Sequence, residues 1–138
     1  MEWFLKVVRD NFSNFEGRAR RKEYWMFILF NLIIQIGFGV AIGIFGAISP
    51  FLIYIPGLVM LAYALYVFIP NLAVLVRRLH DTGNSGWMLL VAFIPLIGGI
   101  WLLVLLCTEG QYGPNQYGPD PKAEFNDDID EIGVKINW

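Results

Sequence analysis

The feature that most constrains this chain is a long stretch without a charged side chain. Residues 24–76 contain no Asp, Glu, Lys or Arg, although charged residues make up 16% of the whole sequence. A helix needs about 20 apolar residues to cross roughly 30 Å of hydrocarbon. The stretch therefore fits two crossings, and Ser49-Pro50 supplies a turn between them. Together with a hydrophobic content of 57%, this pattern predicts a membrane protein.

A third apolar run, Trp87 to Cys107, is also uncharged and just long enough to cross once. We therefore predict an all-α integral membrane protein with three transmembrane helices, which form one domain over residues 1–122. The spans are expected at about 24–48, 51–76 and 87–107. An alternative is that Pro95 and Gly98-Gly99 turn a re-entrant hairpin within the third run. A single crossing is preferred, because non-helical backbone at that depth must be shielded by protein or water.

The basic residues next to the spans predict the orientation. The Arg18–Lys22 cluster and the Arg77-Arg78 pair should both face the cytoplasm, which two intervening crossings allow. A third crossing then places the N-terminus in the cytoplasm and the C-terminus in the periplasm, whereas a re-entrant hairpin leaves both termini inside. Residues 111–120, QYGPNQYGPD, predict an ordered turn. Residues 123–138 are expected to be a solvated acidic extension.

The first residues have the pattern of an amphipathic helix. Residues 1–14 are predicted to form a helix that lies in the cytoplasmic interface or packs on the protein's own cytoplasmic side. Its apolar positions at helical spacing are Trp3, Phe4, Val7, Val8 and Phe12.

Two sets of residues in the first span suggest helix contacts. Gly39, Gly43 and Ala47 stand at four-residue steps, a spacing that permits close approach of span two or of a second copy of the chain. Asn31 and Gln35 share one helix face, where an amide exposed to lipid would be costly. We expect them to form interhelical hydrogen bonds, and a polar track for a ligand is the alternative.

The segment GRARRKEYW, residues 17–25, places four cations directly before the first span. These cations set topology, and they can attract anionic lipid headgroups with about 1 kcal/mol per Lys or Arg near the surface. Nucleic acid is not expected as a partner, because the chain has a net charge of -2 and its basic patches are short.

The segment RRLHDTGNSGW, residues 77–87, is predicted to be the loop after span two. Its charged residues suit the C-terminus of a helix, Gly83 suits its termination, and Ser85 suits the start of the next helix. An imidazole beside a carboxylate, as in His80 and Asp81, can also act as a general base. However, the sequence has no nucleophile elbow, no phosphate-cradling loop, and only one Cys and one His. We therefore predict no catalytic, cofactor-binding or metal-binding residues.

Three blocks of sequence resemble the small bacterial inner-membrane proteins grouped as domain of unknown function 805 (DUF805). The blocks are FEGRARRKEYW at 15–25, RRLHDTGNSGW at 77–87 and GPNQYGPDP at 113–121. The resemblance implies a multi-pass protein of the bacterial inner membrane and no established activity. The signature residues are Gly17, Arg18, Arg21, Glu23, Tyr24 and Trp25, with Arg77, Arg78, His80, Asp81, Gly83, Ser85, Gly86 and Trp87.

These observations predict a non-catalytic membrane protein that binds anionic headgroups or a membrane protein partner. Glu23 and Asp81 are expected to pair with some of the arginines, while other cations contact the ligand. The predicted contact residues are Arg18, Arg20, Arg21, Lys22, Arg77, Arg78 and His80. One alternative is a subunit of an oligomeric small-solute channel or transporter. A less favoured one is a headgroup-modifying enzyme.

Overall fold

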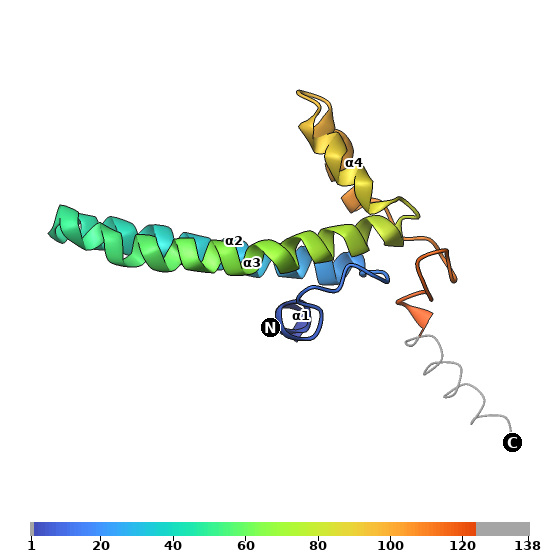
Figure 1. Ribbon diagram of the computed structural model, residues 1–138, viewed down its shortest axis with the longest axis horizontal. Coiled ribbons are helices and arrows are strands. Elements are labelled where there is room, and N and C mark those ends of the chain that lie inside the picture. The colour runs from blue at the N-terminus through green and yellow to red at the C-terminus, as the bar shows by residue number, and fades with distance from the viewer. Residues whose placement is uncertain (1, 124–138) are drawn as a thin grey trace, which may run out of the picture. The chain divides into compact units, whose positions relative to one another are not determined.

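The computed structural model of the protein describes residues 2–123, and the regular elements in this range are helices (Figure 1). The fold class predicted from the sequence is thus confirmed as all-α for the described residues. The predicted acidic extension lies outside them, apart from its first residue. In chain order the elements are α1 (Glu2–Leu5), the π-helical η1 (Lys6–Asp10), α2 (Arg21–Ile48), the 3-10 helix η2 (Pro50–Ile53), α3 (Tyr54–Asp81), the 3-10 helix η3 (Gly86–Phe93) and α4 (Gly98–Cys107).

The chain forms two compact units that interleave along the sequence. In the described part, the first unit consists of residues 2–14 and 22–74, and the second consists of residues 15–21 and 75–123.

The long helices α2 and α3 correspond to the first two predicted spans. Both are long and apolar enough to cross a membrane, and in each only 11% of the most apolar window is buried. A core helix of a soluble protein hides such a window, so these apolar side chains are suited to lipid. Between the helices, Ser49 has extended backbone and Pro50 begins η2, where its missing N–H costs no helical hydrogen bond.

Within the first unit, a buried amide links α2 to α3. Asn31 accepts a hydrogen bond from the Tyr63 hydroxyl at 2.6 Å and donates to the Phe27 carbonyl at 3.1 Å. The expected interhelical hydrogen bond is therefore confirmed for Asn31. Gln35 is exposed, as are Gly39, Gly43 and Ala47, so the role of the small residues in association stays a prediction.

The N-terminal segment packs on this helix pair through aromatic rings. Phe4 stacks on Phe27 with ring centroids 5.5 Å apart, and Phe12 lies 5.0 Å from Tyr66. Figure 1 shows α1 nearly end-on while α2 and α3 lie across the page, so within this unit the segment crosses the pair steeply. This helical segment spans Glu2–Asp10 rather than residues 1–14.

The third apolar run differs from the single continuous helix predicted for residues 87–107. It forms a hairpin of η3 and α4, whose two arms lie side by side in Figure 1. The chain turns at residues 94–97, since Pro95 disfavours helical backbone in the residue before it and Leu96 has a positive φ of 69°. Gly98 lets the arms touch, because a Cβ there would collide with the Val91 carbonyl.

Both ends of this hairpin lie at the C-terminal end of α3. The hairpin starts a few residues after Asp81, and the chain that leaves α4 returns to the same place. There the Gln111 N–H donates to the Asp81 carbonyl at 2.8 Å. Residues 82–111 therefore begin and end at one point of the second unit.

Candidate functional site

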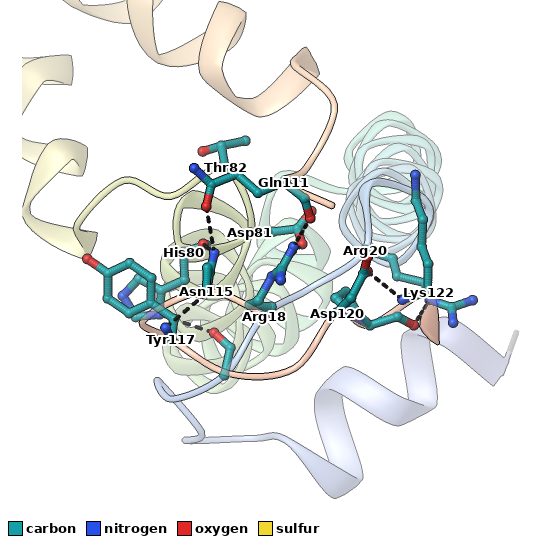
Figure 2. Close-up of polar contacts among 12 residues, drawn as sticks. Arg18, Arg20, His80, Asp81, Thr82, Gln111, Asn115, Tyr117, Asp120 and Lys122 are labelled. Atoms are coloured by element: carbon teal, nitrogen blue, oxygen red, sulfur yellow. Dashed lines mark hydrogen bonds and ion pairs between the residues drawn. The ribbon is translucent and has the colours of Figure 1, made fainter. Parts of the chain in front are cut away.

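The candidate site is a cluster of buried charges around Asp81, at the end of α3 (Figure 2). One oxygen of Asp81 accepts from Arg18 Nε at 3.0 Å, and the other accepts from Arg78 Nη1. The side chains of Arg18, Arg78 and Asp81 are 1%, 0% and 5% exposed. The expected pairing of Asp81 with arginines is therefore confirmed, and it takes place away from solvent.

The other nitrogens of these two guanidinium groups donate to backbone carbonyls that follow the hairpin. Arg18 binds the carbonyls of Gln111 and Gly113, and Arg78 binds those of Leu106 and Thr108. The last carbonyls of a helix lack partners within it, so Arg78 caps the C-terminus of α4. A buried ion cluster is stable only when its remaining donors are satisfied in this way.

His80 lies beside this cluster in a pocket built from two distant segments. Its Nδ1 is 3.2 Å from the Gly17 carbonyl, and its ring stacks on Tyr117 with centroids 3.9 Å apart. The Asn115 side chain donates to the His80 carbonyl at 2.9 Å. Gly17 has a φ of +81°, a conformation that favours glycine.

Glycine and serine residues shape the loop after α3 as the sequence predicts. The Gly83 N–H donates to the His80 carbonyl at 3.0 Å, and its φ of 78° ends the helix. Ser85 accepts from the Trp87 N–H at 3.4 Å and so begins η3. The missing side chain of Gly110 lets the returning chain pass Asp81, because a Cβ there would collide with the carboxylate.

Several pKa values in the second unit depart from their ordinary values. Near the surface, the Lys122–Glu109 hydrogen bond lowers the pKa of Glu109 and raises that of Lys122.

Asp120 links the ends of the returning loop. Burial raises its pKa, but hydrogen bonds from the backbone N–H groups of Lys122 and Gly113 outweigh this, so the net shift is downward. The Arg20 Nε donates to the Pro121 carbonyl next to it. The carboxylate therefore stays charged while it holds the loop closed.

The structure separates the predicted contact residues into two groups. Arg18, Arg77 and Arg78 are buried, and Arg20 and His80 are half-buried. Arg21 and Lys22 are exposed. Of the supporting residues, Glu23 is buried and lies 3.8 Å from Lys6, and Tyr24 is buried with its ring 5.4 Å from that of Trp25.

Sequence reasoning missed the part that the third block plays in the cluster. Gly113, Asn115 and Tyr117 of this block, and Gln111 just before it, all bind residues of the first two blocks. The repeated QYGP motif was the available signal, and it predicted the ordered turn but not the partners of these residues. Within residues 2–123, no three side chains of His, Cys, Asp or Glu are grouped so as to hold a metal ion.

Two long apolar helices whose apolar windows are only 11% buried are typical of an integral membrane protein. Residues 12–119 match the family described as Protein of unknown function (DUF805), and the chain belongs to this family.

Inner membrane protein YhaI of Escherichia coli (strain K12) is 48% identical over 126 residues, which cover 91% of this chain and 100% of the relative. Inner membrane protein YhaH of the same organism is 44% identical over 124 residues, which cover 90% and 99%. No solved structure gives a significant match. The chain is thus an integral inner-membrane protein of a family without an assigned function.

Proposed function

We propose that this protein is a non-catalytic membrane protein that binds anionic lipid headgroups on the cytoplasmic side through its exposed cations. The observation that carries the proposal is the separation of the cations by burial. Arg18 and Arg78 are buried, whereas Arg21 and Lys22 are exposed at the start of α2. Lipid phosphates therefore bind the second pair, and the first pair holds the fold.

The proposed topology has two crossings and a re-entrant hairpin. The contacts of Arg78 with the carbonyls of Leu106 and Thr108 support it. If α4 ended on the opposite side of the membrane, those carbonyls would be separated from Arg78 by about 30 Å of hydrocarbon. Residues 108–123 therefore share the cytoplasmic side with Arg18, and the C-terminus lies inside rather than in the periplasm.

The N-terminal segment is proposed to lie flat in the cytoplasmic interface. Its steep crossing of α2 and α3 supports this, because a helix perpendicular to the spans is parallel to the membrane plane. Val7 is buried, while Arg9 is exposed. This cation joins Lys22 of the same unit in attracting anionic lipid.

The proposal assigns no catalysis to His80 and Asp81 because of the contacts that these two side chains make. Both oxygens of Asp81 accept from guanidinium groups, and Nδ1 of His80 binds a carbonyl. In a catalytic pair of this kind, the carboxylate accepts the N–H of the imidazole and so orients it. The imidazole and the carboxylate bind separate partners, so they do not form a catalytic pair.

The test is native mass spectrometry of the protein released from nanodiscs that contain equal amounts of phosphatidylglycerol and phosphatidylcholine. The wild type should retain phosphatidylglycerol preferentially. The variant R21Q/K22Q should lose about 2 kcal/mol of that preference, or about thirtyfold, if each cation contributes about 1 kcal/mol. The matched control is K122Q, since Lys122 is already paired with Glu109 at 2.9 Å. An unchanged preference in R21Q/K22Q, or an equal loss in K122Q, contradicts the proposal.

A further inference from the structure

A groove of about 340 Å³ lies beside His80 in the second unit, and the proposed function does not use it. Most of its lining is apolar, and its polar side chains come from the last turn of α3 and from the loop that follows. The side chains that line it are Phe15, Val76, His80, Ser85, Trp87 and Leu89. Gly86 also lines the groove, and a Cβ there would lie only 2.8 Å from a methyl group of Val76. Glycine at this position therefore lets η3 pack directly on α3.

The contact with Gly17 fixes the tautomer of His80. A carbonyl oxygen can only accept a hydrogen bond, so Nδ1, at 3.2 Å, must carry the proton that is donated. In the neutral ring, Nε2 then keeps its lone pair and is an acceptor. A Cβ built on Gly86 would lie 3.6 Å from Nε2, so this nitrogen lies beside Gly86 where both residues line the groove. The stacked ring of Tyr117 holds the imidazole in this orientation.

The rest of the lining favours a cationic and amphiphilic ligand. Among the described residues that line the groove, none is Lys or Arg, in contrast to a site for an anion. Phe15 and Trp87 are 40% and 78% exposed at its rim, and aromatic faces attract ammonium groups. The groove also lies where the charge-free stretch ends and the apolar hairpin begins, so a bound molecule meets polar groups at one end and apolar side chains at the other.

We propose that this groove binds the headgroup of an aminophospholipid such as phosphatidylethanolamine. The primary ammonium donates a hydrogen bond to Nε2 of His80 and lies against the Trp87 ring. The hydroxyl of Ser85 accepts from the Trp87 N–H and donates its own hydrogen to a phosphate or ester oxygen of the lipid. The acyl chains follow Leu89 along the hairpin. This site is separate from Arg21 and Lys22, and it selects a headgroup that carries N–H donors.

The single histidine of the chain provides the test. Protein labelled with ¹⁵N in the imidazole ring gives one Nδ1 and one Nε2 resonance in nanodiscs. In phosphatidylcholine alone, whose ammonium has no N–H, the Nε2 resonance should be that of an unprotonated nitrogen. Titration of phosphatidylethanolamine into the nanodiscs should move the Nε2 resonance upfield and leave Nδ1 nearly unchanged.

A matched pair of tryptophan variants tests the groove itself. W87L should raise the phosphatidylethanolamine content needed for half of the shift about three- to fivefold, as expected for the loss of one exposed cation–π contact. W101L should leave that content unchanged, because Trp101 lies on α4 outside the groove. If W87L and W101L change the required phosphatidylethanolamine content equally, the groove is not the binding site.

Two other results would overturn the proposal. One is a resting tautomer with the proton on Nε2. The other is an equal shift on titration of phosphatidylglycerol, whose hydroxyl groups would then be the donors. The R21Q/K22Q variant should keep the full His80 response, so that failure of the anionic-lipid proposal and failure of this one give different results.

Discussion

Replacing Asp81 by Asn should destabilise the protein more than any other single change of charge in the second unit. The substitution keeps the size of the side chain but removes the charge shared by Arg18 and Arg78, which are 1% and 0% exposed. Breaking a buried ion pair by removing one partner costs about 3–5 kcal/mol, because the remaining charge is left buried. At about 4 kcal/mol, the equilibrium constant for unfolding rises about a thousandfold.

The change can be measured as the free energy of unfolding in mixed micelles, where SDS is the denaturant and Trp fluorescence is the signal. The control is E109Q, which neutralises an exposed carboxylate that also pairs with a cation. This control should leave the unfolding midpoint unchanged within error. Adding R18Q to D81N should recover part of the loss, because one of the uncompensated charges is then removed. The coupling free energy of the two substitutions is expected to be about 1–3 kcal/mol.

Two results would refute this reasoning. If D81N costs no more than E109Q, solvent reaches the guanidinium groups and the cluster does not support the fold. If R18Q and D81N are additive, the two residues act independently, and Arg18 is held by the carbonyls of Gln111 and Gly113 rather than by the carboxylate.

Two further predictions concern the hairpin of the second unit. G98A should destabilise the hairpin by about 1–3 kcal/mol through overpacking against η3, whereas G99A, whose new Cβ meets nothing within 4 Å, should be neutral in the same SDS titration. Cys107 should react with a membrane-impermeant maleimide in inverted vesicles and not from the periplasmic side, and the opposite labelling would contradict the re-entrant topology.

The long helices could be predicted from the sequence because length and charge alone decide whether a segment suits a membrane. The charge-free residues 24–76 become α2, η2 and most of α3. The third run satisfied the same criterion of length, yet it folds as a hairpin. There the local preference of Pro95 against helix and the close packing at Gly98 determine the structure. Length therefore predicted a continuous helix correctly only for the first two runs. In the third run, a helix breaker and a close packing contact occur together and produce a hairpin.

The pairing of Asp81 was predictable for a different reason. A single carboxylate next to two arginines, at the end of an apolar helix, has cations within reach whatever the rest of the fold. Which cations are buried was not predictable, because Arg18 and Arg21 look equivalent in the sequence. Their difference depends on carbonyls more than 90 residues away, at Gln111 and Gly113, to which Arg18 is bonded.

The three blocks that carry the family resemblance meet at one place. Arg18 comes from the first block, Asp81 and His80 from the second, and Tyr117 from the third, and their contacts join the end of α3 to the loop after α4. The contacts of the fold therefore account for these residue types in the three blocks. Function should then be sought in residues that the cluster leaves accessible. In this protein the accessible features are the exposed cations at the start of α2 and the groove beside His80, where Nε2 remains an acceptor.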